Sequence, residues 1–287
     1  MDADVLGFFI KIIKSQMEER KKKSSPRHDF IDTLTQTLQS EGSKDRSAFA
    51  NEKDLEKCII ANAFVMFFAG FDTTSTNSSL CTFFLAKNPK CQERLYEEIR
   101  EAVEANGGDE HLDYTLIQKL PYLEACLTES MRAYPLAILL RRATKPYKIP
   151  GTDMVLPKDT EVVIPGSAFN FDPRHYETPE KFNPDHFSEE AVSRRGPYAD
   201  TTFGKWKCLP LESVTKILKT AAIAGHGPRN CIGKRFALLQ LKVAMVRLIY
   251  NYKLLTCDKT IDKMVPDIKS SSLLPKGGMW IKIENRV

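Results

Sequence analysis

The sequence predicts a mainly α-helical protein with a small β region. Two long segments, from about Glu52 to Ala86 and from Phe236 to Tyr250, carry apolar residues at helical spacing. After Pro135 the periodicity changes to two, as at Tyr147-Lys148-Ile149, which is typical of short strands. With 287 residues, of which 42% are hydrophobic and 28% charged, the chain is long enough to bury a substantial core.

Charge and cysteine content exclude several classes of protein. The net charge of +5 is mild and gives little reason to expect nucleic-acid binding. The seven cysteines are scattered and include no Cys-x-x-Cys pair, which argues for a reducing compartment and against a disulfide framework or a zinc ribbon. Acidic residues follow Met1 where a signal peptide would be basic. The apolar run from Ile59 to Phe71 is shorter than the ~20 residues that cross a bilayer as a helix.

The first half of the chain is expected to be helical. Residues 1 to about 40 have helical periodicity with a polar turn at 24–26, and residues 41–51 have none, which predicts a loop. The helix from about Glu52 to Ala86 is apolar on nearly all sides, so we expect it to run through the core.

Two further helices follow. One begins at Asn88-Pro89, where proline suits the first helical position, and stops at Gly107-Gly108. The next runs from about Tyr122 to Tyr134 and ends at Pro135. After Pro135 we expect one small sheet, built from the strands Tyr147–Ile149, Met154–Leu156 and Glu161–Ile164.

Polar residues interrupt the apolar helix at Ala69-Gly70-Phe71-Asp72-Thr73-Thr74. Gly70 costs about 1 kcal/mol relative to alanine in a helix interior, and the Thr73 hydroxyl can bond back to the preceding turn. A break here could open a groove for a small molecule beside an acid and an alcohol. A simple kink or a helix end at the Thr/Ser run explains the same pattern equally well.

A second chemical signal is a cysteine in a glycine-rich loop, directly before a helix. Cys231 precedes the segment that starts at Phe236, and a helix N-terminus stabilises a thiolate, the form that binds metal. Gly227 and Gly233 allow the backbone to approach a flat group, and Arg229 offers donors to an anion. One thiolate suits a single axial ligand position better than a tetrahedral zinc site. The alternative is a structural cysteine near a helix start.

This loop resembles the haem-binding loop of the cytochrome P450 family of haem-thiolate monooxygenases. The family pattern is Phe-Gly-x-Gly-x-Arg-x-Cys-x-Gly; Ala224 stands where phenylalanine is expected, and the later positions are filled by Gly225, Gly227, Arg229, Cys231 and Gly233. The resemblance extends along nearly the whole chain, to a turn at Leu273-Leu274-Pro275 and a strand at Trp280–Ile283. It is closest to the animal microsomal branch that metabolises xenobiotics.

The resemblance implies roles for the residues that match the family's motifs. Cys231 would be the axial ligand of haem b, and Arg229 and Arg142 would pair with its propionates. Asp72 and Thr73 would relay protons, while Ala69, Gly70, Phe203, Gly227 and Gly233 would lie against the cofactor. The substrate pocket would be lined in part by Phe68, Ala137, Ile138, Leu139 and Leu273.

The resemblance also identifies a structural cluster. Glu129 and Arg132 match the family's Glu-x-x-Arg, and Pro179 to Phe187 resembles Pro-Glu-x-Phe-x-Pro-Glu-Arg-Phe. By itself Glu-x-x-Arg is a weak pattern, usually an exposed ion pair. His186 replaces the usual arginine, and an imidazole cannot supply a bidentate fork, so we expect a weaker link than in the family.

Two departures from the family bear on function. Phe203-Gly204 resembles the expected start of the cysteine loop, whose continuation begins at His226, so Lys205 to Gly225 is either an intron read in frame or a surface insertion. An insertion would separate Phe203 from Cys231. Family members also carry a membrane anchor and several helices before the part that Met1 matches. We therefore expect residues 1–287 to form a single partial catalytic domain, the C-terminal part of the fold.

The function implied is an oxidoreductase, a monooxygenase that inserts one oxygen atom from dioxygen into a hydrophobic small molecule. Electrons would come from NADPH through a reductase, with a cytochrome b-type donor as a second partner, at the cytosolic face of the endoplasmic reticulum membrane. Two alternatives stay open. A haem-thiolate isomerase or dehydratase would not need the Asp72-Thr73 pair. A non-catalytic fragment or mispredicted gene product that lacks the N-terminal half would explain the insertion and His186.

Overall fold

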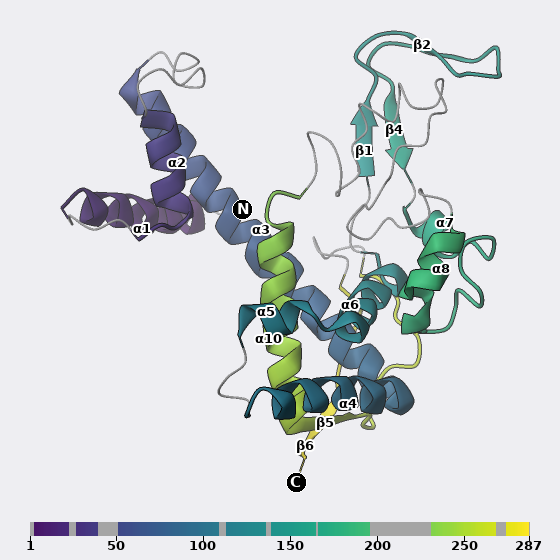
Figure 1. Ribbon diagram of the computed structural model, residues 1–287. Helices are drawn as coiled ribbons and strands as arrows, with labels where there is room; N and C mark the ends of the chain where they lie inside the picture. The colour runs from purple at the N-terminus through teal and green to yellow at the C-terminus, as the bar shows by residue number, and fades with distance from the viewer. Residues whose placement is uncertain are drawn as a thin grey trace. The chain divides into compact units, whose positions relative to one another are not determined.

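The computed structural model of the protein describes residues 3–22, 27–39, 51–108, 113–135, 139–164, 166–195, 231–267 and 274–286. Its elements are mainly helices with a few short strands, as the sequence predicts (Figure 1). The chain divides into two compact units, Met1–Asp72 and Thr73–Val287. Each unit is built around its own buried side chains.

The first unit contains α1 (Ala3–Lys22), α2 (Phe30–Gln39) and the first part of α3 (Glu52–Lys87). Its core is small. Ile13, Ile60 and Ala63 form one buried cluster, and Leu55 and Ile59 form a second. The polar turn expected at 24–26 and the loop at 41–51 lie outside the described residues, apart from Asn51, which precedes α3.

The prediction that α3 runs through the core is wrong for its middle. Val65, Phe67, Phe68 and Phe71 are exposed, Phe71 by 72%. A helix that is apolar on all sides needs apolar partners on all sides to be buried, and the described residues supply them on one side only. By length and hydropathy alone α3 could also cross a membrane, a test that core helices of soluble proteins pass as well.

The polar stretch of α3 does not break the helix. α3 is continuous from Glu52 to Lys87. Downstream of Thr73, polar side chains bond back to the helix carbonyls: Asn77 Nδ2 donates to the Thr73 carbonyl at 2.8 Å and Ser79 Oγ to the Ser75 carbonyl at 2.9 Å. Of the alternatives drawn from the sequence, a helix end at the Thr/Ser run is therefore wrong.

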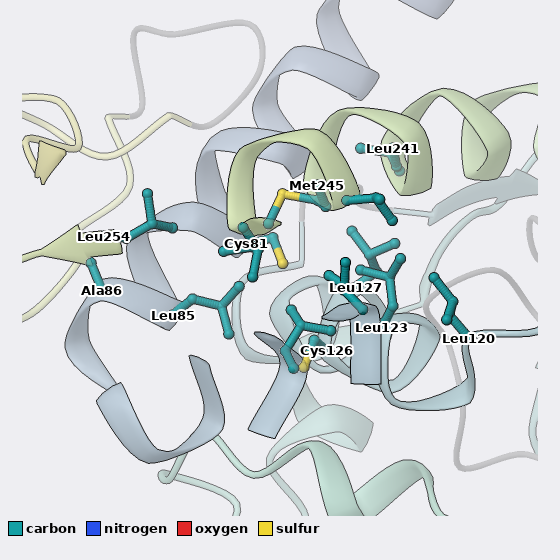
Figure 2. Close-up of a cluster of buried hydrophobic side chains, with 14 of the residues drawn as sticks. Cys81, Leu85, Ala86, Leu120, Leu123, Cys126, Leu127, Leu241, Met245 and Leu254 are labelled. Atoms are coloured by element: carbon teal, nitrogen blue, oxygen red, sulfur yellow. The ribbon is translucent and has the colours of Figure 1, made fainter. Parts of the chain in front are cut away.

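The second unit holds the larger core. The end of α3 packs with α4 (Pro89–Ala105), α6 (Pro121–Ala133) and α10 (Lys234–Asn251), while α5 (Tyr114–Gln118) adjoins α10. Figure 2 shows side chains from these helices meeting, among them Leu85, Leu123, Leu127 and Met245. The predicted helices at 88–107, 122–134 and 236–250 are thus confirmed within two residues at each end.

The β region consists of pairs rather than the single sheet expected. β1 (Leu139–Arg142) pairs with β4 (Glu161–Ile164), and β2 (Tyr147–Lys148) pairs with β3 (Val155–Leu156), both antiparallel. Figure 1 shows β1 and β4 side by side. β1 had no strand pattern in the sequence because it has two adjacent leucines followed by two adjacent arginines, not alternation. A third pair joins β5 (Tyr252–Leu255) to β6 (Lys282–Asn285), which begins two residues later than predicted.

An irregular segment, residues 171–188, follows α7 (Gly166–Asn170) and ends in a short 3₁₀ helix, η3 (Pro184–Phe187). We call it the meander. It packs on α6, and α8 (Glu189–Arg194) follows it. Asn183 caps η3, accepting a hydrogen bond from the Asp185 amide. Since the meander has little regular secondary structure, its backbone groups must find partners elsewhere.

Gln92 joins α4 to β5 inside the core. It is almost fully buried, and its Nε2 donates to the carbonyls of Leu85 and Leu254 at 3.2 and 2.8 Å. Its Oε1 accepts from the Leu254 amide at 2.8 Å. One side chain thus completes the backbone hydrogen bonding of a buried strand residue.

We predict that Gln92→Ala lowers the free energy of unfolding by about 2–4 kcal/mol, because it leaves the buried amide and carbonyl of Leu254 without these partners. Urea unfolding monitored by circular dichroism measures the loss. Lys90→Ala, at an exposed position of the same helix, is the control and should change the midpoint little. Equal effects of the two substitutions would contradict the role given to Gln92.

Candidate functional site

Cys231 is a free, exposed cysteine three residues before the start of α10 (Lys234). Gly233 is the N-cap of α10 and has no side chain to cap it, so the first helical N–H groups are left to other partners. Beside the cysteine, Ile232 and Phe236 are 83% and 62% exposed. The thiol is therefore flanked by apolar side chains that the described residues do not cover.

Other cysteines do not share this environment. Burial raises the pKa of the Cys81 thiol to about 12, partly offset by a hydrogen bond with Ser130, and burial also raises the pKa of Cys126 well above its usual range. Both stay protonated and are poor ligands. Among the described residues no group of three or more His, Cys, Asp or Glu side chains could hold a metal ion. Burial thus disfavours Cys81 and Cys126 as thiolate ligands, whereas Cys231 is exposed.

Several predicted cofactor and pocket residues lie outside the described residues: Phe203, Gly227, Arg229, Ala137, Ile138, Leu273, the insertion 205–225 and the side chain of Leu139. Of the others, Gly233 precedes α10, and Phe68, Ala69 and Gly70 lie on the exposed part of α3. A Cβ added to Gly70 or Gly233 would meet no atom within 4 Å. Neither glycine is required by packing within the described protein.

Asp72 and Thr73 are consecutive residues of the continuous helix α3. Asp72 is half-buried and Thr73 is exposed. In the following turn, the buried atoms Thr74 Oγ1 and Asn77 Oδ1 have no hydrogen-bond partner among the residues that the structure describes. Buried polar groups in this state are normally satisfied by water or a ligand. The stretch that the sequence marks as polar thus retains unused hydrogen-bonding capacity.

Arg142 ends β1 opposite Glu161, and its Nη2 donates to Glu161 Oε1 at 3.0 Å. Both side chains are mostly exposed, so the pair contributes little and can be exchanged for another anion. The predicted contact of Arg142 with a propionate is compatible with this position.

Glu129 and Arg132 form a fully buried pair on α6. Arg132 Nε donates to Glu129 Oε2 at 2.7 Å and Nη2 to Oε1 at 2.9 Å, and neither side chain has any exposed surface. The remaining guanidinium donors reach the meander side: Nη1 donates to the Asn170 carbonyl at 2.7 Å, and Nη2 to the carbonyls of Pro179 and Lys181 at 2.9 and 3.3 Å. The pair therefore ties α6 to the segment that follows it.

Glu129 also accepts from the meander. Its Oε1 accepts a hydrogen bond from the Asn183 amide at 2.8 Å and lies 3.2 Å from His186 Nδ1. We call Glu129, Arg132, Asn183 and His186 the Glu129 cluster. A buried ion pair is stable only when its remaining donors and acceptors are satisfied, and here backbone groups of the meander do this. His186 contacts Glu129 through one ring nitrogen, and its other ring nitrogen lies 2.6 Å from the Glu177 carbonyl oxygen.

Sequence reasoning missed the aromatic and cationic neighbours of the cluster. The Arg132 guanidinium lies 4.9 Å from the Tyr176 ring, and that of Arg195, beyond α8, lies 4.5 Å from the same ring. Tyr176 is buried, and its ring contacts His186 edge-on at 5.5 Å. No pattern in a single sequence indicates these contacts, because the residues lie on three different elements.

Two further interactions hold the start of α6, one from α4 and one from α10, the helix that follows Cys231. Glu98 of α4 caps α6 because its carboxylate accepts hydrogen bonds from the amides of Tyr122 and Leu123 at 2.8 and 2.9 Å. Burial raises the pKa of the Glu98 carboxyl, and these two amides partly offset the rise. Lys242 of α10 is buried and donates to Glu124 Oε2 at 2.8 Å. α10 is thus held against the start of α6.

Comparison with known proteins decides the family. The sequence profile described as Cytochrome P450 matches residues 3–282. The chain belongs to the cytochrome P450 family. It is 36% identical over 258 residues to the protein named "Probable cytochrome P450 6a13" of Drosophila melanogaster, covering 90% of this chain and 46% of that one. It is also 32% identical to cytochrome P450 6B2 of Helicoverpa armigera and 34% identical to cytochrome P450 9e2 of Blattella germanica, each over 97% of this chain.

The match covers nearly all of this chain but only part of its relatives. Cytochromes P450 6B2 and 9e2 are covered over 52% and 50% of their lengths. The chain thus spans about half the length of the curated relatives it matches. The family assignment agrees with the mainly helical fold and with the resemblance seen in the cysteine loop.

This cytochrome P450 offers an internal comparison for the Glu129 cluster. Glu97 and Arg100 on α4 have the same Glu-x-x-Arg spacing, but they form an exposed pair at 2.5 Å. We predict that Arg132→Lys lowers the free energy of unfolding by about 3–5 kcal/mol, because an ammonium cannot replace the fork and its carbonyl contacts. Arg100→Lys should leave unfolding nearly unchanged.

Urea unfolding of both variants measures the difference. If Arg132→Lys lowered the free energy of unfolding no more than Arg100→Lys does, the buried cluster would not hold α6 and the meander together.

Proposed function

We propose that this chain is part of a haem-thiolate monooxygenase that inserts one oxygen atom from dioxygen into a hydrophobic small molecule. The observation that carries the proposal is a free, exposed cysteine three residues before α10, which the sequence resemblance matches to the family's axial ligand. The family match over residues 3–282 supports it. In this account residues 1–287 form one partial catalytic domain.

The described residues fit haem b. The Cys231 thiol is exposed, and the exposed side chains of Ile232 and Phe236 beside it offer apolar contact to a flat group. Haem, when bound, supplies the binding and activation of dioxygen. Cys231 would hold the iron through its sulfur, with Gly227, Gly233, Ala69, Gly70 and Phe203 against the cofactor.

Two arginines would hold the propionates. Arg142 has an exposed partner in Glu161 that a propionate can replace, since exposed ion pairs contribute little. Arg229 would supply a second guanidinium from the loop before Cys231.

Asp72 and Thr73 would move protons. The half-buried carboxyl of Asp72 can exchange protons with water, and the hydroxyl of Thr73 can both accept and donate. The unpartnered atoms Thr74 Oγ1 and Asn77 Oδ1 can hold water beside this pair. An isomerase or dehydratase would not use such a relay, which favours the monooxygenase.

The substrate would be hydrophobic, since the expected lining residues are apolar: Phe68, Ala137, Ile138, Leu139 and Leu273. Electrons would come from NADPH through a reductase that docks near the basic start of α10, at Lys234 and Arg235, or from a cytochrome b-type donor. This arrangement would operate at the endoplasmic reticulum membrane, in xenobiotic metabolism.

A second proposal is that the chain as given does not catalyse. Lys205 to Gly225 separates Phe203 from Cys231. A chain lacking 205–225 should bind haem more tightly than the full chain if the segment is foreign to the fold. Equal affinities would indicate a tolerated surface insertion.

We predict that Cys231→Ser abolishes the thiolate spectrum of the haem complex and weakens haem binding by at least the ~10–100-fold that loss of an outer-shell partner costs. The matched control is Cys257→Ser, at a free, half-buried cysteine whose thiol pKa is lowered by a hydrogen bond from Thr260. Haem titration measures the affinity of each variant for haem. The absorption spectrum of the reduced carbon monoxide complex then shows whether the thiolate ligand is present. Loss of the spectrum in the Cys257 variant alone would overturn the assignment.

We predict that Thr73→Val in the reductase-reconstituted protein lowers product formation by about 10²-fold while haem binding is unchanged, because valine keeps the shape and removes the hydroxyl. Ser79→Ala, which removes another helix hydroxyl of α3, should retain activity. Oxygenated product per NADPH consumed is the measurement. Full activity of the valine variant would remove Thr73 from the relay.

A further inference from the structure

A groove of about 560 Å³ lies between α1 and α3 within the first unit. Its volume is in the range of roughly 300–1,000 Å³ that is usual for pockets that hold small ligands. Leu6 and Val65, which line it, are 38% and 59% exposed, so the described residues leave apolar surface uncovered there. The apolar lining residues come from both helices: Leu6, Ile10, Ile60, Ala61, Phe64 and Val65.

The charged lining residues gather at one end of this groove. On α3 they are Lys53, Glu56 and Lys57, which all precede the apolar lining residues, and on α1 the single one is Lys14, which follows them. The Lys14 ammonium lies 3.3 Å from Glu56 Oε1, so the charged ends of the two helices meet.

The apolar ends of the two helices also meet. The ring centroids of Phe9 on α1 and Phe64 on α3 are 5.7 Å apart. Ile60 belongs to the buried cluster with Ile13 and Ala63, so the apolar end rests on the core of the unit. The groove therefore has a charged end and an apolar end.

The charged end carries an excess of positive charge, because three lysines face one glutamate there. Lys14 is paired with Glu56, and Lys57 is paired with Asp54 at 3.1 Å in an exposed ion pair. Within the described part of the chain, Lys53 has no acidic partner. An anion bound at this end would meet at least one ammonium group that is not already neutralised.

The groove is also elongated. Twelve residue steps of about 1.5 Å each carry α3 about 18 Å from Lys53 to Val65. A ligand that follows the groove needs a long, narrow apolar part and a negative charge at one end only.

We propose that this groove binds a long-chain aliphatic carboxylate, that is, a free fatty acid. The carboxylate lies at the end that carries Lys53 and Lys57, and the chain extends along α3 to Phe64 and Val65. The site contains none of the residues assigned to haem, to the proton relay or to the substrate lining. The inference therefore does not rest on the proposed function.

The test is calorimetric titration of the full chain with dodecanoate, at monomeric ligand concentrations, with haem added and without it. We expect one saturable site per chain and the same affinity in both samples. Dodecanol, which has the same chain length and no charge, should bind about 3–5-fold more weakly, the contribution of one exposed ion pair.

Two pairs of variants locate the ligand. Lys53→Glu should weaken dodecanoate about 5–30-fold and leave dodecanol unchanged, since it reverses the charge beside the carboxylate. Lys11→Glu, an equal change of charge at an exposed position of α1 outside the groove, is the control and should alter neither ligand. Ala61→Trp should fill the apolar end and weaken both ligands, whereas Ser15→Trp should weaken neither.

A further measurement uses only the wild-type chain. Nuclear Overhauser effects from the terminal methyl group of bound dodecanoate should reach the side chains of Phe64 and Val65 and not that of Lys53. The reverse pattern, or equal affinity for dodecanoate and dodecanol, would overturn the proposal. So would a chain that is dimeric in solution and becomes monomeric in Ala61→Trp, because the groove would then be covered by a second copy.

Discussion

The buried pair of Arg132 and Glu129 is the interaction on which the second unit depends. Both charges are removed from water, which is costly unless every donor and acceptor is met. The meander supplies the missing partners with its backbone carbonyls and the Asn183 amide. Two side chains of α6 therefore anchor a segment with little regular structure. The backbone groups of that segment, in turn, satisfy the hydrogen-bonding groups of the two buried charges.

Buried polar contacts also link α6, which carries this cluster, to the helix that follows Cys231. Glu98 caps α6, and Lys242 of α10 pairs with Glu124 in the first turn of α6. Cys231 lies three residues before α10, so these buried polar contacts and the apolar packing position the helix that follows it. Loops that carry function are commonly positioned by such rigid scaffolds.

Much of the helical fold could be predicted from the sequence, because helical periodicity and the proline and glycine signals at helix ends are local. The long helices and the place of Cys231 before a helix were predictable in this way. Local patterns could not show that Glu129 and Arg132 are buried while the identically spaced Glu97 and Arg100 are exposed, since burial is decided by distant residues such as Asn170 and Asn183. The exposure of Phe71 could not be predicted for the same reason. The strand at Leu139–Arg142 was missed because its apolar and polar residues do not alternate.

Native-state hydrogen exchange at the Asn183 amide tests the central claim most directly. This amide lies in an irregular segment, and its partner is Glu129 Oε1 at 2.8 Å. If the buried pair holds the meander, the Asn183 amide should exchange as slowly as helix amides of the core, such as that of Leu127, because both are exposed only when the unit unfolds. Exchange at the rate of exposed turn amides would show that the meander opens independently and would contradict the account.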